Sequence, residues 1–232
     1  MHSFLPIKPP LRYFDTKKRS LSNISEVASE LPKLLLTSRV QSKINSLAKN
    51  SFSVDCLIKN KKDREINLDM AQLSFIGHAY IWGGNKPQNV LPEVVSAPWV
   101  KLSKYLGRPP ILSYASYCLD NWYKIDKSEP ISLNNVALIN NFLGGVDEDW
   151  FVTIHVCIED AATESIDSAY NLSLLNDKNN VNQFSLALKK IVKSLNKVNH
   201  IFAKMPEKCD PYVYFHRVRP YIFGTKDNPD LK

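Results

Sequence analysis

Apolar residues recur at helical spacing along most of this chain, and this pattern predicts mainly helix. Glycine is rare, with seven in 232 residues, and alternating apolar and polar runs are few. Helices that follow one another without intervening strands indicate an all-α fold. The expected helices cover residues 25–47, 69–82, 92–106, 110–123, 148–174, 182–204 and 212–223.

Proline, glycine and small polar residues suggest where these helices begin and end. Ser25 is a plausible N-cap for the first helix, although Pro32 can restart it. The helix over 92–106 opens on a proline and closes on Gly107. The last helix is expected to bend at Pro220, and residues 51–58 predict a short strand or an extended linker.

A polar, glycine-bearing gap at residues 143–147 is the candidate domain boundary. The pattern therefore predicts a small N-terminal helical domain over 1–145, preceded by an extended, proline-rich arm. Residues 146–232 would form the first helices of a larger helical domain.

Composition narrows the class of protein. Hydrophobic residues make up 44% and charged residues 23%, which is ordinary for a globular chain that can build a core. The net charge is +7, but the lysines are scattered and carry no nucleic-acid-binding motif, so no nucleic-acid partner is expected. No apolar run spans a membrane and no secretory leader is evident, so we expect a cytoplasmic protein. The four cysteines lack zinc-site spacing and fit a reducing compartment.

The segment 210–221 carries four aromatic residues and three potentially cationic side chains. If it is helical, Phe215 and Arg219 lie four residues apart on one face. A flat apolar ring beside a guanidinium can hold an aromatic ligand that bears a carboxylate. The alternative is an aromatic core helix whose arginines remain in solvent.

A second segment, 150–159, places Phe151 and His155 four residues apart on an otherwise apolar stretch. A single histidine on an apolar helix face is more often a hydrogen-bonded core residue than a catalytic one. The sequence contains no GxSxG, HExxH, GxGxxG or P-loop motif that would indicate another chemistry.

Together with the stretch 106–115 and Asn121-Trp122, these segments resemble the indoleamine 2,3-dioxygenase family, in one order from about Leu68 to the last residue. The family consists of haem enzymes that open the indole ring of tryptophan. The resemblance implies a haem (iron protoporphyrin) cofactor, and tryptophan or a related indoleamine with dioxygen as substrates. The product would be N-formylkynurenine-like, in tryptophan catabolism by the kynurenine pathway.

The resemblance also implies roles for two polar residues. His155 would face the open side of the haem iron and accept a hydrogen bond from the indole N–H. Arg219 would hold the substrate carboxylate in a bidentate contact. An ion pair between Arg219 and Glu159 is the alternative for that arginine.

The aromatic residues would shape the indole site. The resemblance makes Tyr114 and Phe151 apolar walls and Tyr214 and Phe215 an aromatic pair on the substrate side. Tyr117, one turn after Tyr114, is either part of the same wall or ordinary core.

The proximal histidine of the haem is expected beyond Lys232, so the resemblance assigns no metal ligand within this chain. His78 is expected to be structural, and His200 and His216 exposed or interfacial. We therefore expect the distal half of a haem site and weak haem binding at most. The alternatives are a truncated, non-catalytic paralogue that binds a ligand or partner, and an unrelated all-α scaffold. The sequence leaves the oligomeric state open.

Overall fold

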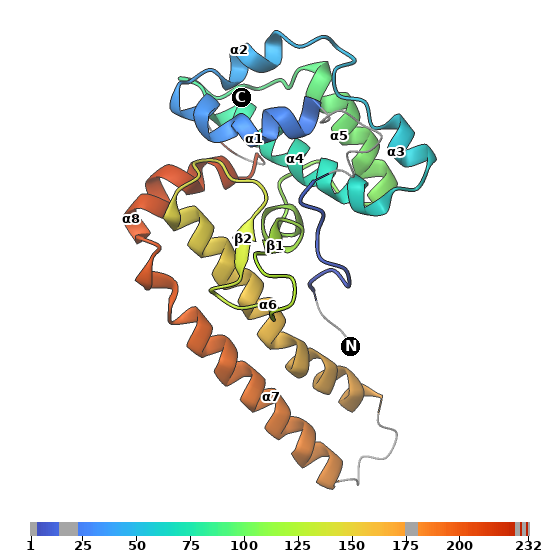
Figure 1. Ribbon diagram of the computed structural model, residues 1–232, viewed down its shortest axis with the longest axis vertical. Coiled ribbons are helices and arrows are strands. Elements are labelled where there is room, and N and C mark those ends of the chain that lie inside the picture. Colours follow the sequence, from blue (N-terminus) through green and yellow to red (C-terminus); the bar gives the residue numbers. More distant parts are fainter. Residues whose placement is uncertain (1–3, 14–22, 175–180, 226–227, 229–230, 232) are drawn as a thin grey trace.

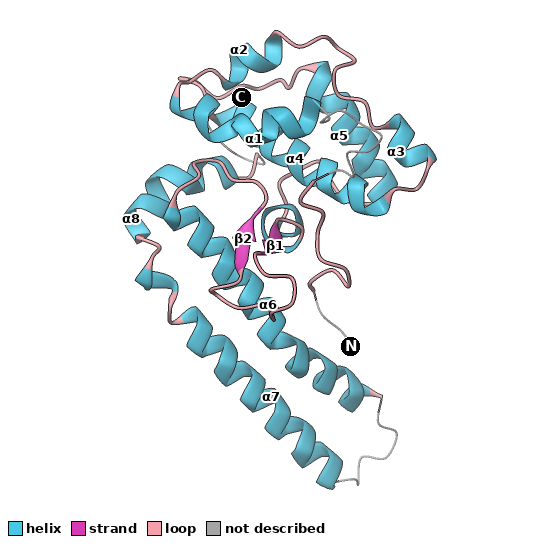
Figure 2. Ribbon diagram, viewed as in Figure 1, coloured by secondary structure: helices cyan, strands magenta, loops and turns pink. Residues whose placement is uncertain are grey.

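The computed structural model describes residues 4–13, 23–174, 181–225, 228 and 231, and it confirms the all-α fold class (Figures 1 and 2). The one sheet in these ranges is a two-stranded ribbon. No helix within the described ranges combines the length and the apolar content needed to cross a bilayer.

Five helices form the N-terminal part, and they correct the sequence prediction in two places. The first expected helix is two helices, because Ser38 between them adopts a left-handed backbone with φ of 53°. The segment 51–58 contains a helix instead of a strand or extended linker. The five are α1 (Asn23–Leu36), α2 (Val40–Asn45), α3 (Asp55–Lys59), α4 (Asp63–Trp82) and α5 (Glu93–Leu106).

Helix α4 is the centre of the core. Its residues from Leu68 to Ile81 are all buried, which explains why its apolar pattern is continuous rather than one-sided. It packs against α1 and α5 and also contacts the C-terminal segment. At Gly77 a Cβ atom would lie 2.4 Å from the Trp99 ring, so glycine allows α5 to approach α4 closely.

The helix expected over 110–123 is the clearest error. Only a π-helical turn, η1 (Ala115–Leu119), forms there, followed by β1 (Trp122–Lys124), which pairs antiparallel with β2 (Val136–Leu138). The buried Asn121 side chain donates to the Tyr117 and Asn140 carbonyls and accepts from the Asn140 N–H. These bonds redirect the chain from helix to ribbon.

Helix α6 (Val146–Ser173) and helix α7 (Val181–Phe202) form a hairpin that projects from the rest of the molecule (Figure 1). The hairpin is followed by the short turn η2 (Met205–Glu207). The single helix expected over 212–223 is instead a series of short turns, namely α8 (Pro211–Val213), the π-helical η3 (Tyr214–Val218) and η4 (Arg219–Ile222).

The main hydrophobic core continues across the expected boundary at residue 145, since Val152 and Val156 of α6 pack into it. A second cluster joins Trp150 and Ile154 to Tyr214 and Val218. The division into domains 1–145 and 146–232 stays a prediction.

Candidate functional site

The first turn of α6 is joined to the segment that carries Tyr214. The Asp147 carboxylate accepts a hydrogen bond of 2.7 Å from the Asp210 N–H, and the Trp150 indole N–H donates to the Lys204 carbonyl at 2.9 Å. Asp210 caps α8 by accepting from two backbone N–H groups. These contacts bring Tyr214 against α6.

Four rings then form a continuous row along α6, which we call the aromatic row: Tyr114, His155, Phe151 and Tyr214. Tyr214 stacks on Phe151 with 4.1 Å between ring centroids, and Phe151 lies 4.2 Å from the His155 ring. Tyr114 meets His155 edge-on at 6.0 Å. Tyr117 flanks the row, with its ring 6.4 Å from Phe151. The structure thus brings together residues from three segments that are far apart in sequence.

The tautomer of His155 follows from its partner. Its Nδ1 atom lies 2.7 Å from the Phe151 carbonyl oxygen. A carbonyl can only accept, so Nδ1 carries a hydrogen, and Nε2 is the ring nitrogen left to accept a hydrogen bond in the tautomer with a single N–H. His155 is half-buried.

Tyr114 is fixed by a hydrogen bond of 2.8 Å from its hydroxyl to Glu159 Oε1. Burial raises the pKa of Tyr114 far above its usual range, and the bond to Glu159 adds to the effect. Glu159 thus contacts Tyr114, and among the described residues it forms no ion pair with Arg219.

Phe215 and Arg219 do not join the aromatic row by any contact within the described part of the chain. Phe215 is 50% exposed and Arg219 is also exposed. The Arg219 guanidinium lies over the Phe215 ring at 5.2 Å, a cation–π contact. Both stay predictions as substrate contacts.

Arg108 organises the loop that carries Tyr114. Its guanidinium forms an ion pair of 3.1 Å with Asp120 and donates to the Ser113 and Ser116 hydroxyls at 3.3 and 2.9 Å. Burial raises the pKa of Asp120, and the Arg108 charge opposes that rise. Arg108 is a positioning residue, and the sequence analysis included it only within the stretch 106–115.

Substituting Arg108 by alanine is expected to lower the free energy of unfolding by about 3 kcal/mol, because Asp120 would keep a largely buried charge without a partner. Arg108→Lys should restore only part of the lost stability, since an ammonium group cannot reproduce the several fixed N–H donors of the guanidinium. Urea unfolding measures the loss, and the His155 ring proton resonances should shift in parallel. An unchanged His155 spectrum in Arg108→Ala would contradict the positioning role.

Glu148 is a second residue that the sequence did not single out. It is fully buried in the first turn of α6 and accepts hydrogen bonds from the Phe142 and Leu143 N–H groups at 2.8 to 3.0 Å. Burial raises the pKa of Glu148 to about 7, although these bonds favour its charged form. Its signal in the sequence was only an acidic residue after a glycine pair.

The other histidines lie outside the aromatic row. His78 is buried, and both of its ring nitrogens bond to backbone atoms: Nδ1 to the Tyr221 carbonyl at 2.8 Å and Nε2 to the Leu112 N–H at 3.1 Å. His200 and His216 are exposed. No group of three or more His, Cys, Asp or Glu side chains in the described ranges is arranged to hold a metal ion.

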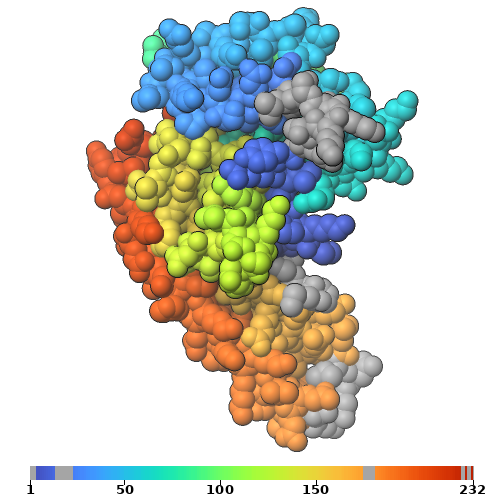
Figure 3. Space-filling view, in the orientation of Figure 1, coloured from blue at the N-terminus to red at the C-terminus, as the bar shows by residue number. Residues whose placement is uncertain are grey.

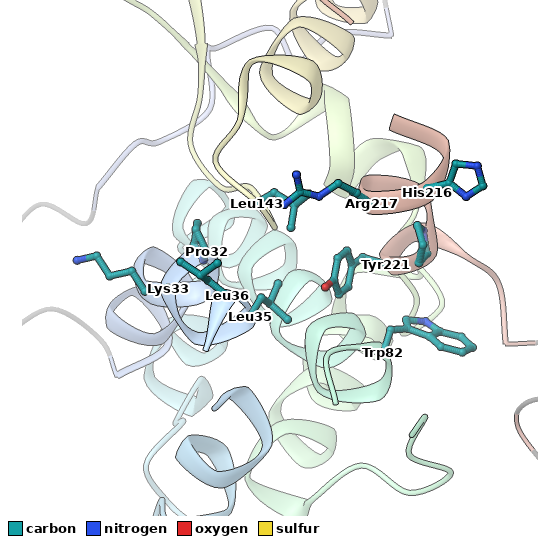
Figure 4. A pocket seen from close by; sticks show the side chains of 10 residues that line it. Pro32, Lys33, Leu35, Leu36, Trp82, Leu143, His216, Arg217 and Tyr221 are labelled. Carbon is teal, nitrogen blue, oxygen red and sulfur yellow. The ribbon is translucent and has the colours of Figure 1, made fainter. Parts of the chain in front are cut away.

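A separate hollow of ≈ 550 Å³ lies between α1, the end of α4 and the C-terminal turns (Figure 4). Figure 4 shows the Tyr221 hydroxyl directed toward Leu35 and the Arg217 side chain extending toward Leu143. None of the predicted site residues lines this hollow, namely Tyr114, Phe151, His155, Tyr214, Phe215 and Arg219. The lining residues are Pro32, Lys33, Leu35, Leu36, Trp82, Leu143, His216, Arg217, Pro220 and Tyr221.

The aromatic row is built on a mainly helical scaffold, and no hydrogen bond to the His155 Nε2 atom is formed within the described part of the chain. The family model described as indoleamine 2,3-dioxygenase matches residues 1–232. The chain belongs to the indoleamine 2,3-dioxygenase family.

Curated relatives agree with this assignment. The chain is 32% identical over 207 residues to indoleamine 2,3-dioxygenase 1 of Rattus norvegicus, covering 88% of this chain and 50% of the relative. It is 30% identical over 234 residues to indoleamine 2,3-dioxygenase of Saccharomyces cerevisiae, covering 96% of this chain and 50% of that relative. The chain therefore spans about half the length of the curated relatives it matches.

Proposed function

We propose that this chain supplies the distal, substrate-facing half of a haem-dependent dioxygenase that opens the indole ring of tryptophan or a related indoleamine. The observation that carries the proposal is the aromatic row with the free Nε2 acceptor of His155. Family membership supports the reaction class, and the activity of the 232 residues is itself part of the proposal.

The residues present fit one side of a planar haem group. The row offers an apolar surface and an imidazole nitrogen that can accept a hydrogen bond. His78 cannot bind iron without losing a backbone hydrogen bond, because both of its nitrogens are engaged. When bound, haem would supply dioxygen activation. The residues of this chain would hold and orient the indole.

His155 would accept the indole N–H at Nε2 and thereby fix which edge of the ring faces the oxidant. Phe151 and Tyr114 would set the plane of the ring, and the exposed Arg219 would bind the carboxylate. Tyr114 would be held in place through Glu159. The runner-up is a non-catalytic member of the family that binds an aromatic carboxylate without turnover.

Two pairs of ligands test this assignment. L-Tryptophan is expected to bind about 10-fold more tightly than 1-methyltryptophan, which lacks the N–H, and His155→Ala should erase that difference. It should likewise bind at least about 10-fold more tightly than tryptamine, which lacks the carboxylate, and Arg219→Gln should erase that second difference. Titration calorimetry with hemin present measures both.

Arg217→Gln is the matched control, since it removes the same charge from an exposed neighbour. If His155→Ala and Arg219→Gln weaken all three ligands equally, the assigned contacts are wrong. Production of N-formylkynurenine by the reduced protein in the presence of haem would exclude the non-catalytic alternative.

A further inference from the structure

Glu148 is a buried carboxylate without a cation beside it. It is fully buried, and it belongs to no ion pair within the described ranges. Backbone groups hold its two oxygens instead. The Phe142 N–H donates to both oxygens at 2.9 and 3.0 Å, and the Leu143 N–H donates to Oε2 at 2.8 Å. A carboxylate held in this way loosens its hold when it takes up a proton, because charge-assisted hydrogen bonds are stronger than neutral ones.

The segment that Glu148 holds supports the aromatic row from behind. Phe142 is fully buried, and its ring lies 6.5 Å from the ring of Tyr117. Tyr117 in turn lies 6.4 Å from the Phe151 ring, and its hydroxyl oxygen is 3.4 Å from that of Tyr214. Packed rings therefore connect the backbone held by Glu148 to two members of the row. Close-packed interiors transmit small displacements of this kind.

The start of α6 lies where three parts of the chain meet. Figures 1 and 3 show it in yellow, between the blue N-terminal helices and the red C-terminal turns. Phe142 makes contact with both parts, since its ring lies 4.6 Å from Phe75 of α4 and stacks on Tyr221 of η4 at 5.1 Å. A shift of Phe142 therefore also moves its neighbours.

The titratable groups that face Glu148 are mainly phenols. They are Tyr117 of η1, Tyr214 of η3 and Tyr221 of η4. Burial raises the pKa of each phenol and the charge of Glu148 adds to the rise, so the three hydroxyls stay neutral. Asp149 lies beside Glu148 on α6, where burial raises its pKa as well.

The lysines near α6 contact other groups. Lys208, just beyond η2, lies over the Trp150 ring at 4.4 Å, and Lys197 of α7 acts on Asp160, about three turns further along α6. The strand β2 also packs on α6 and carries no titratable side chain. Burial therefore raises the pKa of Glu148 to about 7 without a cation to oppose it.

We infer that Glu148 is a positioning residue for the aromatic row, and that its charged form holds Phe142 and Leu143 where the packed rings support the row. Taking up a proton weakens this hold, so the row loosens and ligand affinity falls. The inference rests on the proposed function for the identity of the ligand. The stability of the whole fold follows pH in the opposite direction, because burying the charge costs free energy although the charged form makes the stronger local hydrogen bonds.

Nuclear magnetic resonance on the full 232-residue chain tests the inference without a ligand. Carbon-13 labels report the Glu148 carboxyl group and the rings of Phe151 and Tyr214. As the pH falls from about 8 to about 6, both rings should shift in one step, with the same midpoint as the Glu148 carboxyl. Rings that do not shift, or that shift at another midpoint, would overturn the inference.

Variants assign the step to one group. Glu148→Gln should abolish it, whereas Asp149→Asn, which removes the neighbouring charge and keeps an acceptor for the Asn141 side chain, should leave it. Histidine side chains also change charge in this pH range, so His155→Ala is a second control and should keep the step. Circular dichroism confirms that each variant is folded. A step that survives in Glu148→Gln or disappears in His155→Ala belongs to another group.

Ligand affinity provides the second measurement. The ligand is 1-methyltryptophan, which has no N–H for His155, and titration calorimetry is done with hemin present. Its dissociation constant should rise about 5-fold from pH 8 to pH 6 in the wild type and in Asp149→Asn, and Glu148→Gln should show the weaker value throughout. Affinity that is independent of Glu148 would overturn the inference. If neither tryptophan nor 1-methyltryptophan binds while the ring step follows Glu148, the proposed function fails and the positioning role stands.

Discussion

Replacing Glu148 with alanine is expected to lower the free energy of unfolding by roughly 4 kcal/mol. The carboxylate accepts the backbone N–H groups of Phe142 and Leu143, and its loss leaves these donors unpaired in the interior. Urea unfolding followed by tryptophan fluorescence measures the change. Glu148→Gln, which keeps an acceptor oxygen, should recover about half of the loss.

The same residue predicts a pH dependence with a definite sign. Glu148 has a pKa of about 7 in the folded protein against an ordinary 4.5, so the folded state binds a proton more tightly than the unfolded chain. The stabilisation that comes from this tighter proton binding is fully present below pH 4.5 and is lost as the pH rises through 7. The free energy of unfolding should change by roughly 3 kcal/mol over this range. Glu148→Gln should flatten this part of the stability profile. Burial also raises the pKa values of Asp120 and Asp149. These two groups therefore lower the stability in the same direction as the pH rises, and they should leave a smaller slope in the Glu148→Gln variant. A wild-type slope that survives in full in Glu148→Gln would assign the effect to them instead.

His78→Ala is expected to lower the free energy of unfolding by roughly 3 kcal/mol, because the Leu112 N–H and the Tyr221 carbonyl would both lose their partner beside a new cavity. The exposed His200→Ala is the control and should change little. Limited proteolysis should also speed up near Tyr221 in the His78 variant, since that bond ties the C-terminal turns to α4.

The pH response of His78 has the opposite sign to that of Glu148. Burial lowers the pKa of His78, so below about pH 6.5 the unfolded chain takes up a proton that the folded chain resists. The stability that His78 gives is present above that pH and is lost as the pH falls through its lowered pKa. Removing the imidazole should therefore flatten the acid side of the profile. An acid side that is equally steep in His78→Ala would contradict this assignment.

The sequence predicted α4, α5, α6 and α7 because their apolar spacing is long and regular. The prediction was wrong where hydrogen bonds from side chains, and not the apolar periodicity, determine the path of the backbone. Residues 110–123 read as helical, yet Asn121 bonds to Asn140, nineteen residues away, and a ribbon forms. No local pattern contains that information.

The candidate site divides in the same way. Phe151 and His155 were paired from their spacing on one helix, and the structure brings them together at 4.2 Å. Their contacts with Tyr114 and Tyr214 depend on how separate segments pack. The sequence did not indicate the structural roles of Glu148 and Arg108. Glu148 accepts hydrogen bonds from backbone N–H groups and Arg108 donates to serine hydroxyls, and these partners come together only in the folded chain.

The two π-helical turns, η1 and η3, lie next to Tyr114 and contain Tyr214. A π turn holds one residue more than the α turn it replaces. Deleting a single residue from either turn would rotate the chain before the turn relative to the chain after it by about 100°. The aromatic row is therefore tuned by chain length as well as by side-chain identity. Point substitutions at η1 and η3 can be absorbed by neighbouring rings, but a one-residue deletion swings a tyrosine out of the row altogether. Deletion scanning should find these two short turns far less tolerant of deletion than of substitution.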